Sequence, residues 1–163
     1  MKTGAQTKRP HNLQKQSGFS LLEILVAMAI MAILGGIMVN QFMGQTEKAT
    51  FERLKGDLAV IDSALIQYHS DNFLLPTTEQ GLQALVTRPD ASPTPKNYPR
   101  RGYLKELKND PWGNPYQYAY PGEFGEYDVY SLGADGEEGG EGLASDVGNW
   151  NIDEALQALK AQE

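Results

Sequence analysis

No cysteine occurs among the 163 residues of the chain. This absence excludes a disulfide framework, a thiolate zinc site and any reaction that uses a thiol nucleophile. It is compatible with either side of a membrane, so it does not indicate a compartment. Histidine is scarce as well, with His11 and His69 alone. Without a nucleophile motif or a histidine-rich cluster, the sequence argues against an enzyme.

Clustered basic charge is missing from most of the chain. The net charge is -7, and residues 1–18 contribute +4 without any acid, so residues 19–163 carry -11. Arg100 and Arg101 form the one adjacent basic pair in that acidic part. Because phosphate binding needs clustered lysine and arginine, the sequence argues against nucleic acid as the main partner. The length suits one modest domain with appendages.

One long apolar run lies near the N-terminus, with a carboxylate close to its start. The 21 residues from Phe19 to Val39 make a helix of about 31 Å, close to the hydrocarbon thickness of a bilayer. Basic residues precede this run, so the positive-inside rule predicts a cytoplasmic leader and places everything after Asn40 outside the cytoplasm, which in a Gram-negative cell is the periplasm. Glu23 needs a partner, because a charge at the centre of a membrane helix costs about 2.5–3.5 kcal/mol.

The small-residue cleavage site of an ordinary secretory signal does not follow the apolar run, where residues 40–43 read NQFM. Gly18 instead precedes the run, directly after the basic tip. A protease facing the cytoplasm would cut there and leave the membrane helix on its product. From these residues alone, an uncut signal anchor explains the pattern equally well.

Apolar residues then recur at spacings of three and four, which is typical of an amphipathic helix that packs on a sheet. SDN at 70–72 and Pro76 indicate where this helix ends. The pattern therefore predicts one helix from about Ser20 to about Asn72. Its apolar stripe consists of Phe51, Leu54, Leu58, Ile61, Leu65 and Tyr68.

The remaining sequence predicts a small α+β region. Thr77 with Gln80 forms a capping box for a short helix through about Val86, and Asn151 with Glu154 forms one for a final helix through about Lys160. The proline-rich stretch 87–99 is expected to be a packed loop, bracketed by Tyr98 and Tyr103.

A β-hairpin is expected between these two helices. Alternating tyrosines at 116–120 and the alternating stretch 127–132 flank the turn sequence PGEFGE. We expect the tyrosines to pack one sheet face against the long helix, rather than to form a platform for a ligand.

A glycine-rich acidic loop follows the hairpin. Alternating glycine and carboxylate residues can wrap oxygen ligands round a hard cation, and calcium takes six to eight such oxygens. An EF-hand is excluded, since a strand precedes the loop and Gly139 stands where position five needs a ligand. A solvated loop that binds nothing remains the alternative. The five acids of the loop are Asp135, Glu137, Glu138, Glu141 and Asp146.

The stretch GFSLLE at 18–23, after a basic leader and at the head of an apolar helix, resembles the class III signal of type IV pilins and pseudopilins. The stretches 71–85 (DNFLLPTTEQGLQAL), 110–118 (DPWGNPYQY) and 130–140 (YSLGADGEEGG) closely resemble the major pseudopilins of type II secretion systems. Together they cover the chain from residue 17 to about 151, and the tail from Ile152 lies outside the pattern.

This resemblance implies an α+β, type IV pilin-like fold, in which a long N-terminal helix, half membrane-spanning and half amphipathic, packs on a small antiparallel sheet with a C-terminal loop. It implies that a prepilin peptidase cuts after Gly18 and methylates the new amine of Phe19. Glu23 would then pair with the amine of a neighbouring subunit in the filament. The implied segments are a removed cytoplasmic leader (1–18), a transmembrane and filament-core helix (19–40), the amphipathic half-helix (41–75) and a periplasmic region (76–163) with the calcium-type loop 133–150.

The function implied is that of a structural subunit, without a reaction of its own, in a periplasmic pseudopilus that drives folded exoproteins through the outer membrane. The implied partners are further copies of the chain, minor pseudopilins, the prepilin peptidase, an inner-membrane assembly platform and the secretin. The protein would be a single-pass protein of the inner membrane. A type IV pilin for adhesion, motility or DNA uptake is the alternative, and the missing disulfide argues against it. An anchored enzyme with Asp128 and Asp135 as acid and base is a weaker third hypothesis, because the sequence contains no nucleophile motif.

The resemblance also implies calcium in the loop after the last strand. The backbone oxygen of Leu132 and the side chains of Asp135 and Asp146 match residues of the family pattern. Many relatives have a further aspartate where this sequence reads GLA at 142–144, so either Glu141 substitutes for it or the loop has a low affinity for calcium.

Overall fold

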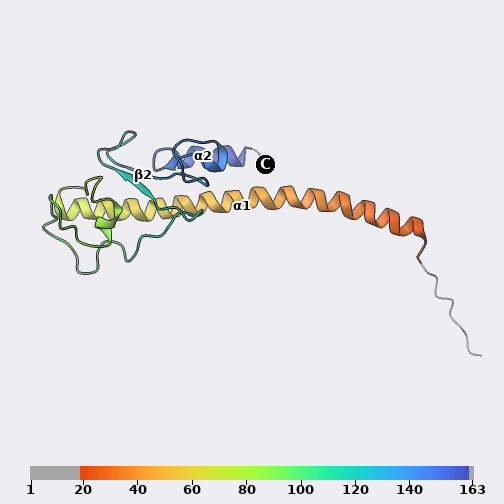
Figure 1. The fold of residues 1–163 in the computed structure, drawn as a ribbon, viewed down its shortest axis with the longest axis horizontal. Coiled ribbons are helices and arrows are strands. Elements are labelled where there is room, and N and C mark those ends of the chain that lie inside the picture. The colour runs from red at the N-terminus through yellow and green to blue at the C-terminus, as the bar shows by residue number, and fades with distance from the viewer. Residues whose placement is uncertain (1–18, 162–163) are drawn as a thin grey trace, which may run out of the picture. The chain divides into compact units, whose positions relative to one another are not determined.

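The computed structural model describes residues 19–161, and within them the side chains outside 35–45. The chain divides into two compact units, Met1–Asn40 and Gln41–Glu163, and each is described by itself. The first element, α1, is the helix Leu21–Asn72 (Figure 1). The predicted leader, residues 1–18 with the cleavage residue Gly18, lies outside the described residues.

In the first unit, α1 begins with a serine cap. The backbone amide of Glu23 donates a hydrogen bond to Ser20 Oγ over 3.2 Å, which satisfies one of the free amides at the helix start. The side chains of residues 19–34 are exposed. Among the described residues, no helix combines the length and hydropathy that a membrane span requires. The predicted span 19–40 extends into residues whose side chains are not described.

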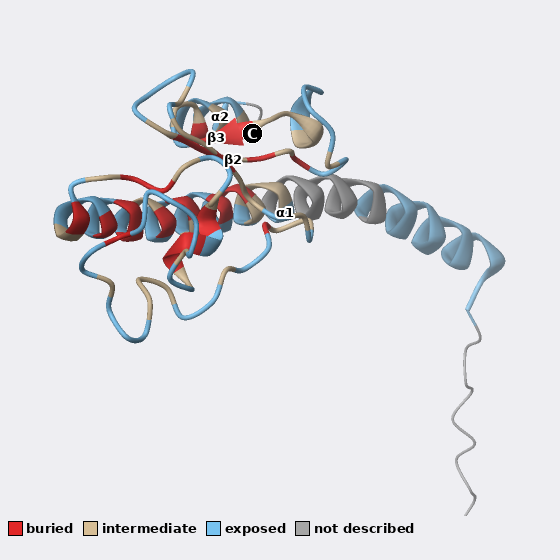
Figure 2. Cartoon of the chain, turned by 60° about the vertical axis from the view of Figure 1, so that its left-hand side comes forward, coloured by how far each residue is buried: buried red, intermediate tan, exposed pale blue. Residues whose placement is uncertain are grey.

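In the second unit, the predicted apolar stripe of α1 is buried, which confirms that prediction. Leu54, Leu65 and Tyr68 are completely buried, and Phe51, Leu58 and Ile61 are nearly so. Figure 2 shows buried residues on this part of α1 and on the segments packed against it. Burying a leucine or isoleucine side chain contributes about 1.5–3 kcal/mol, so this stripe is a main source of the stability of the unit.

The segment after α1 differs from the predicted short helix. Thr77 and Gln80 do form the reciprocal capping bonds, at 3.0 and 3.2 Å between backbone nitrogen and side-chain oxygen. The chain then makes a turn followed by a four-residue 3-10 helix, η1 (Leu82–Leu85). The reason is Gly81, whose φ of 58° and ψ of -168° interrupt the helical path that the capping box begins.

The loop after η1 is packed, as predicted. Tyr98 and Tyr103 stack edge to face with each other, and both rings contact Tyr68 of α1 at centroid distances of 6.5 and 5.1 Å. The side-chain amide of Asn72 donates to the Tyr103 hydroxyl at 2.8 Å. Burial raises the pKa of Tyr103 to about 12, because a phenolate would lose its hydration there.

The predicted hairpin is present and gains a third strand. β1 (Gln117–Ala119) pairs with β2 (Asp128–Ser131), and β2 pairs with the two-residue β3 (Val147–Gly148), both antiparallel. β3 lies within the stretch that the sequence analysis took for loop. With two residues in a glycine-rich segment, it has no alternation that would identify it.

The tyrosines of the hairpin do not all face the long helix. Tyr116 and Tyr127 donate hydrogen bonds to Asp57 and Asp62 of α1, as the prediction implies. Tyr130 pairs with Gln117 on the opposite face, because side chains alternate along a strand. Its ring lies 5.6 Å from that of Trp150. This part of the prediction was wrong.

The last helix, α2 (Ile152–Lys160), was predicted correctly, but its predicted cap was not. Asn151 makes no capping bond to the helix; its side chain accepts from the Gly148 amide at 2.8 Å and donates to the Asp146 carbonyl at 3.1 Å. α2 buries Ile152 and Leu156 in the same core as α1.

Candidate functional site

The predicted N-terminal site residues that the structure describes are Phe19 and Glu23. Phe19 is 79 % exposed and precedes α1. Glu23 stands in the first turn of α1, with an exposed side chain. A carboxylate there interacts favourably with the positive end of the helix dipole, so Glu23 also supports the helix start. The intersubunit pairing expected of Glu23 stays a prediction.

The predicted calcium loop is folded by backbone bonds. The Ala134 amide donates to the Leu143 carbonyl at 2.8 Å, and the 3-10 turn η2 (Gly142–Ala144) brings the chain back towards β3. Gly133, with a φ of 70°, is crowded, since a Cβ there would lie 2.7 Å from the Ala144 carbonyl carbon. Because Gly133 has no side chain, the loop can close beside the end of β2.

The predicted ligands are only partly brought together. Asp135 and Glu141 are exposed, and the Asp135 carboxylate accepts the Glu137 amide at 3.2 Å. Within the described part of the chain, no three acidic, histidine or cysteine side chains gather as a metal cluster. A calcium site here would therefore need backbone carbonyl oxygens beside its carboxylates, which calcium accepts readily.

Asp146 is the residue of the loop that best fits a cation. Its Oδ2 accepts the Gly139 amide at 2.9 Å. Its Oδ1 is buried and has no hydrogen-bond partner. A buried carboxylate oxygen without a donor costs free energy, so a cation at this oxygen would relieve the cost.

A buried carboxylate that the sequence analysis missed anchors the start of this loop. Asp110 is 2 % exposed, and its Oδ1 accepts the amides of Trp112 and Asn114 at 3.1 and 2.7 Å. Its Oδ2 accepts the Ser131 hydroxyl, which itself accepts the Gly133 amide at 3.1 Å. The DPWGN turn is thereby joined to the end of β2. An aspartate before Pro-x-Gly-Asn is a signal for such a side-chain-closed turn.

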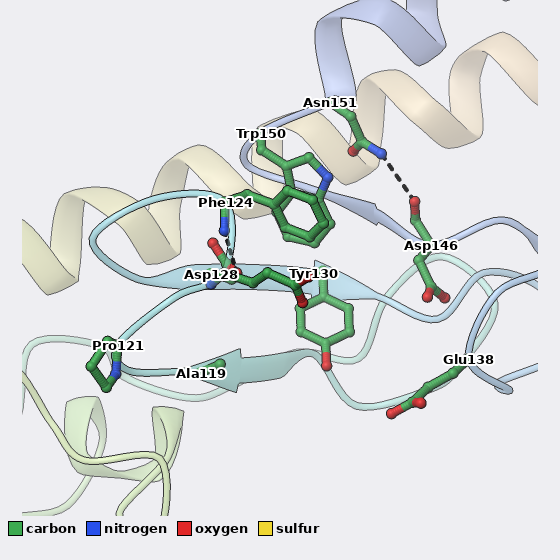
Figure 3. A pocket seen from close by; sticks show the side chains of 10 residues that line it. Ala119, Pro121, Phe124, Asp128, Tyr130, Glu138, Asp146, Trp150 and Asn151 are labelled. Atoms are coloured by element: carbon green, nitrogen blue, oxygen red, sulfur yellow. Dashed lines mark hydrogen bonds between the residues drawn. The ribbon is translucent and has the colours of Figure 1, made fainter.

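A cleft of about 630 Å³ lies between the hairpin turn, β2 and the acidic loop (Figure 3). The rings of Phe124 and Trp150 stack beside it, 4.3 Å apart at 17°. Every charged residue in its lining is acidic, and burial, followed by the negative charge of Glu138, raises the pKa of Tyr130 there. The lining comprises Ala119, Pro121, Glu123, Phe124, Asp128, Tyr130, Glu138, Asp146, Trp150 and Asn151.

Asp128, which was considered above as an acid of an enzyme, closes the hairpin turn instead. Its Oδ2 accepts the amides of Glu123 and Phe124 at 2.6 and 3.1 Å. Gly122 lets the turn approach it closely, since a Cβ on that residue would lie 2.6 Å from Asp128 Oδ1. The structure thus assigns a structural contact to this carboxylate.

Two protein families match the chain. Residues 41–150 match the family described as type II secretion system (T2SS), protein G, and residues 13–39 match the prokaryotic N-terminal methylation motif. The second match contains all three predicted N-terminal site residues. The match to the protein G family ends before α2 begins.

Curated relatives cover most of the chain. The type II secretion system core protein G of Vibrio cholerae is 50 % identical over 140 residues, 86 % of this chain and 95 % of that protein. The protein of the same description from Pseudomonas aeruginosa is 51 % identical over 138 residues, 85 % of this chain and 97 % of that protein.

A solved structure is similar as well. The major pseudopilin from the type 2 secretion system of enterohaemorrhagic Escherichia coli matches with a TM-score of 0.62 and 43 % identity. The match covers 67 % of this chain and 93 % of that one. The type IV pilin-like α+β fold expected from the sequence is thereby confirmed.

Proposed function

Since the chain belongs to the protein G family of type II secretion systems, we propose that it is cut after Gly18, methylated on Phe19 and joined to its neighbours through Glu23. It is a major pseudopilin, the subunit that assembles into the pseudopilus of type II secretion. The observation that carries this conclusion is the match of residues 41–150 to the family, together with relatives about half identical over most of the chain. Its family is one of structural subunits, and we propose that the chain catalyses no reaction.

The proposed processing rests on the methylation motif over residues 13–39. Together with the match to the protein G family, this motif supports a membrane-anchored subunit of a periplasmic pseudopilus. Within this setting the proposed topology is a single pass through the inner membrane, with residues 1–18 in the cytoplasm and 41–163 in the periplasm. The proposed partners are further copies, minor pseudopilins, the prepilin peptidase, the assembly platform and the secretin.

Mass spectrometry of the intact protein from membranes tests this processing. We expect a chain that begins at Phe19 and carries one additional methyl group. Cells without the prepilin peptidase are the control and should contain the full-length chain. A chain that still begins at Met1 in cells with the peptidase would contradict the proposal.

We also propose that the acidic loop binds calcium through Asp146 and Asp135, with the Leu132 carbonyl and Glu141 as further ligands. The buried, unpartnered Oδ1 of Asp146 supports this proposal. Bound calcium would offset part of the negative charge of the loop and tie the end of β2 to β3. That is its whole contribution, because the loop carries no reacting group.

Calcium removal is expected to destabilise the protein. At a calcium concentration about 100 times its Kd, binding stabilises the fold by about 2.7 kcal/mol. Chelation should therefore lower the Tm of the full chain in detergent by on the order of 5 °C. Calcium, but not magnesium, should restore it. Asp146→Ala should abolish the calcium response, and Glu137→Ala, a neighbouring exposed acid, should keep it; an Asp146→Ala protein with an unchanged response would refute the site.

A further inference from the structure

Among the described residues, the cleft beside β2 is lined by four acids and by no basic residue. Asp128 is 3 % exposed, and although its Oδ2 accepts two amides, its Oδ1 is buried without any partner. Glu123 and Glu138 line the same cleft and are exposed at its rim. Since no basic residue lines the cleft to offset these acids, the cleft fits a ligand that brings positively charged donors.

The aromatic wall of the cleft indicates which kind of cation fits. Phe124 is 59 % exposed although its ring stacks on Trp150, so a large apolar face is left open beside the acids. A guanidinium group is planar, stacks on aromatic rings and donates several hydrogen bonds to carboxylates. An ammonium group or a metal ion would use the acids but not the ring faces. The cleft is therefore best suited to arginine.

The chain carries an arginine pair without a partner in the part that the structure describes. Arg100 and Arg101 are exposed, and within the described residues neither takes part in a hydrogen bond or an ion pair. Their backbone is nevertheless fixed. The Gly102 amide donates to the Pro99 carbonyl at 3.0 Å, and the Tyr103 amide donates to the Leu85 carbonyl at 2.7 Å. The loop thus presents two guanidinium groups from an ordered base.

One copy of the chain does not bring these two features together. The loop that carries Arg100 and Arg101 is bonded to η1 through the Tyr103 amide and the Leu85 carbonyl, and none of its residues lines the cleft. A contact between them needs a second copy. Such a contact joins two different surfaces, and repeated contacts of this kind build an open helical filament rather than a closed dimer.

We propose that the cleft formed by Glu123, Asp128, Glu138, Phe124 and Trp150 receives Arg100 and Arg101 of a neighbouring pseudopilin in the filament. The proposal rests on the assembly function above and identifies the surfaces that meet between the globular units. It also accounts for how acidic subunits associate: residues 19–163 carry -11, so neighbouring copies repel one another except where opposite charges face each other.

A charge exchange in the full chain tests the contact. Arg100→Glu with Arg101→Glu, and separately Glu123→Arg with Glu138→Arg, should each lower the amount of filament at least tenfold. Combining all four substitutions, or expressing the two double variants together, should restore filaments. The matched control is Glu126→Arg with Glu137→Arg, two exposed acids outside the cleft lining, which should leave filament formation within about twofold, as expected for rim charges.

Disulfide trapping gives a second readout, which is clean because the chain has no cysteine. Arg101→Cys and Glu138→Cys in one chain should yield a ladder of multimers on oxidation in membranes. Adding Glu23→Ala, which is expected to stop assembly, should remove the ladder. The control is Lys96→Cys with Glu138→Cys, which should give no ladder. Lys96 is an exposed cation of the same loop but lies outside the arginine pair.

The outcomes separate this contact from the function on which it rests. Full filaments from Arg100→Glu with Arg101→Glu would overturn the contact but leave the pseudopilin assignment intact. Loss of filaments without rescue by the exchanged charges, and without a ladder, would overturn it too, because the cleft would then serve another partner. Processing at Gly18 should be normal in every variant, so an unprocessed chain would indicate failure upstream of assembly.

Discussion

Replacement of Glu23 by alanine is expected to lower filament formation at least a hundredfold, while membrane insertion and cleavage after Gly18 continue. Cleavage creates a positive amine on Phe19, at a helix end where the dipole is positive too, so a carboxylate is needed nearby. Removing one partner of a buried ion pair costs about 3–5 kcal/mol, and each 1.4 kcal/mol is a tenfold change in an equilibrium.

The measurement is the fraction of pseudopilin recovered in sheared filaments, together with secretion of an exoprotein. Glu52→Ala is the matched control, because Glu52 is an exposed acid of the same helix. It should assemble normally. Filaments and secretion at the native level from Glu23→Ala would show that Glu23 does not set the subunit register.

Asp110→Ala is expected to have the largest effect on stability, a loss of about 3–4 kcal/mol in the free energy of unfolding. It removes the acceptor of two backbone amides and of the Ser131 hydroxyl at a position that is 2 % exposed. Each buried donor that loses its acceptor costs about 1–3 kcal/mol, although neighbouring losses are not additive. The total free energy of unfolding of a native domain is about 5–15 kcal/mol, so the loss expected for Asp110→Ala is a substantial part of it.

Urea unfolding, followed by the fluorescence of Trp112 and Trp150, measures this loss. Asp90→Ala is the control, since Asp90 is an exposed aspartate, and its effect should stay within about 0.5 kcal/mol. An Asp110→Ala protein as stable as this control would mean that water satisfies the three donors.

The sequence predicted those features that arise from near neighbours in the chain. The stripe from Phe51 to Tyr68 repeats within one helix, and its period indicates both the helix and the buried face. The capping box of Thr77 with Gln80 is equally local, and both of its bonds form. The family was recognisable because its motifs are contiguous stretches.

The features that were missed depend on residues far apart in the sequence. Asp110 meets Ser131 across 21 positions, and the side chain of Asn149 reaches the Val129 amide across 20. No periodicity encodes such pairs. Asn151 was assigned to the helix that follows it, whereas its side chain bonds backward to Gly148 and Asp146. Gly81 matched a helix by its neighbours, but its own φ of 58° ends the turn.

At helix α2, the end of the family match differs from the end of the folded unit. The family match ends at residue 150, yet Ile152 and Leu156 belong to the same buried cluster as Leu54 and Val129. The Nζ atom of Lys55 in α1 also lies 2.6 Å from Oδ1 of Asp153 at the start of α2. The last residues are therefore part of the same folded core as α1, although the family match stops before them.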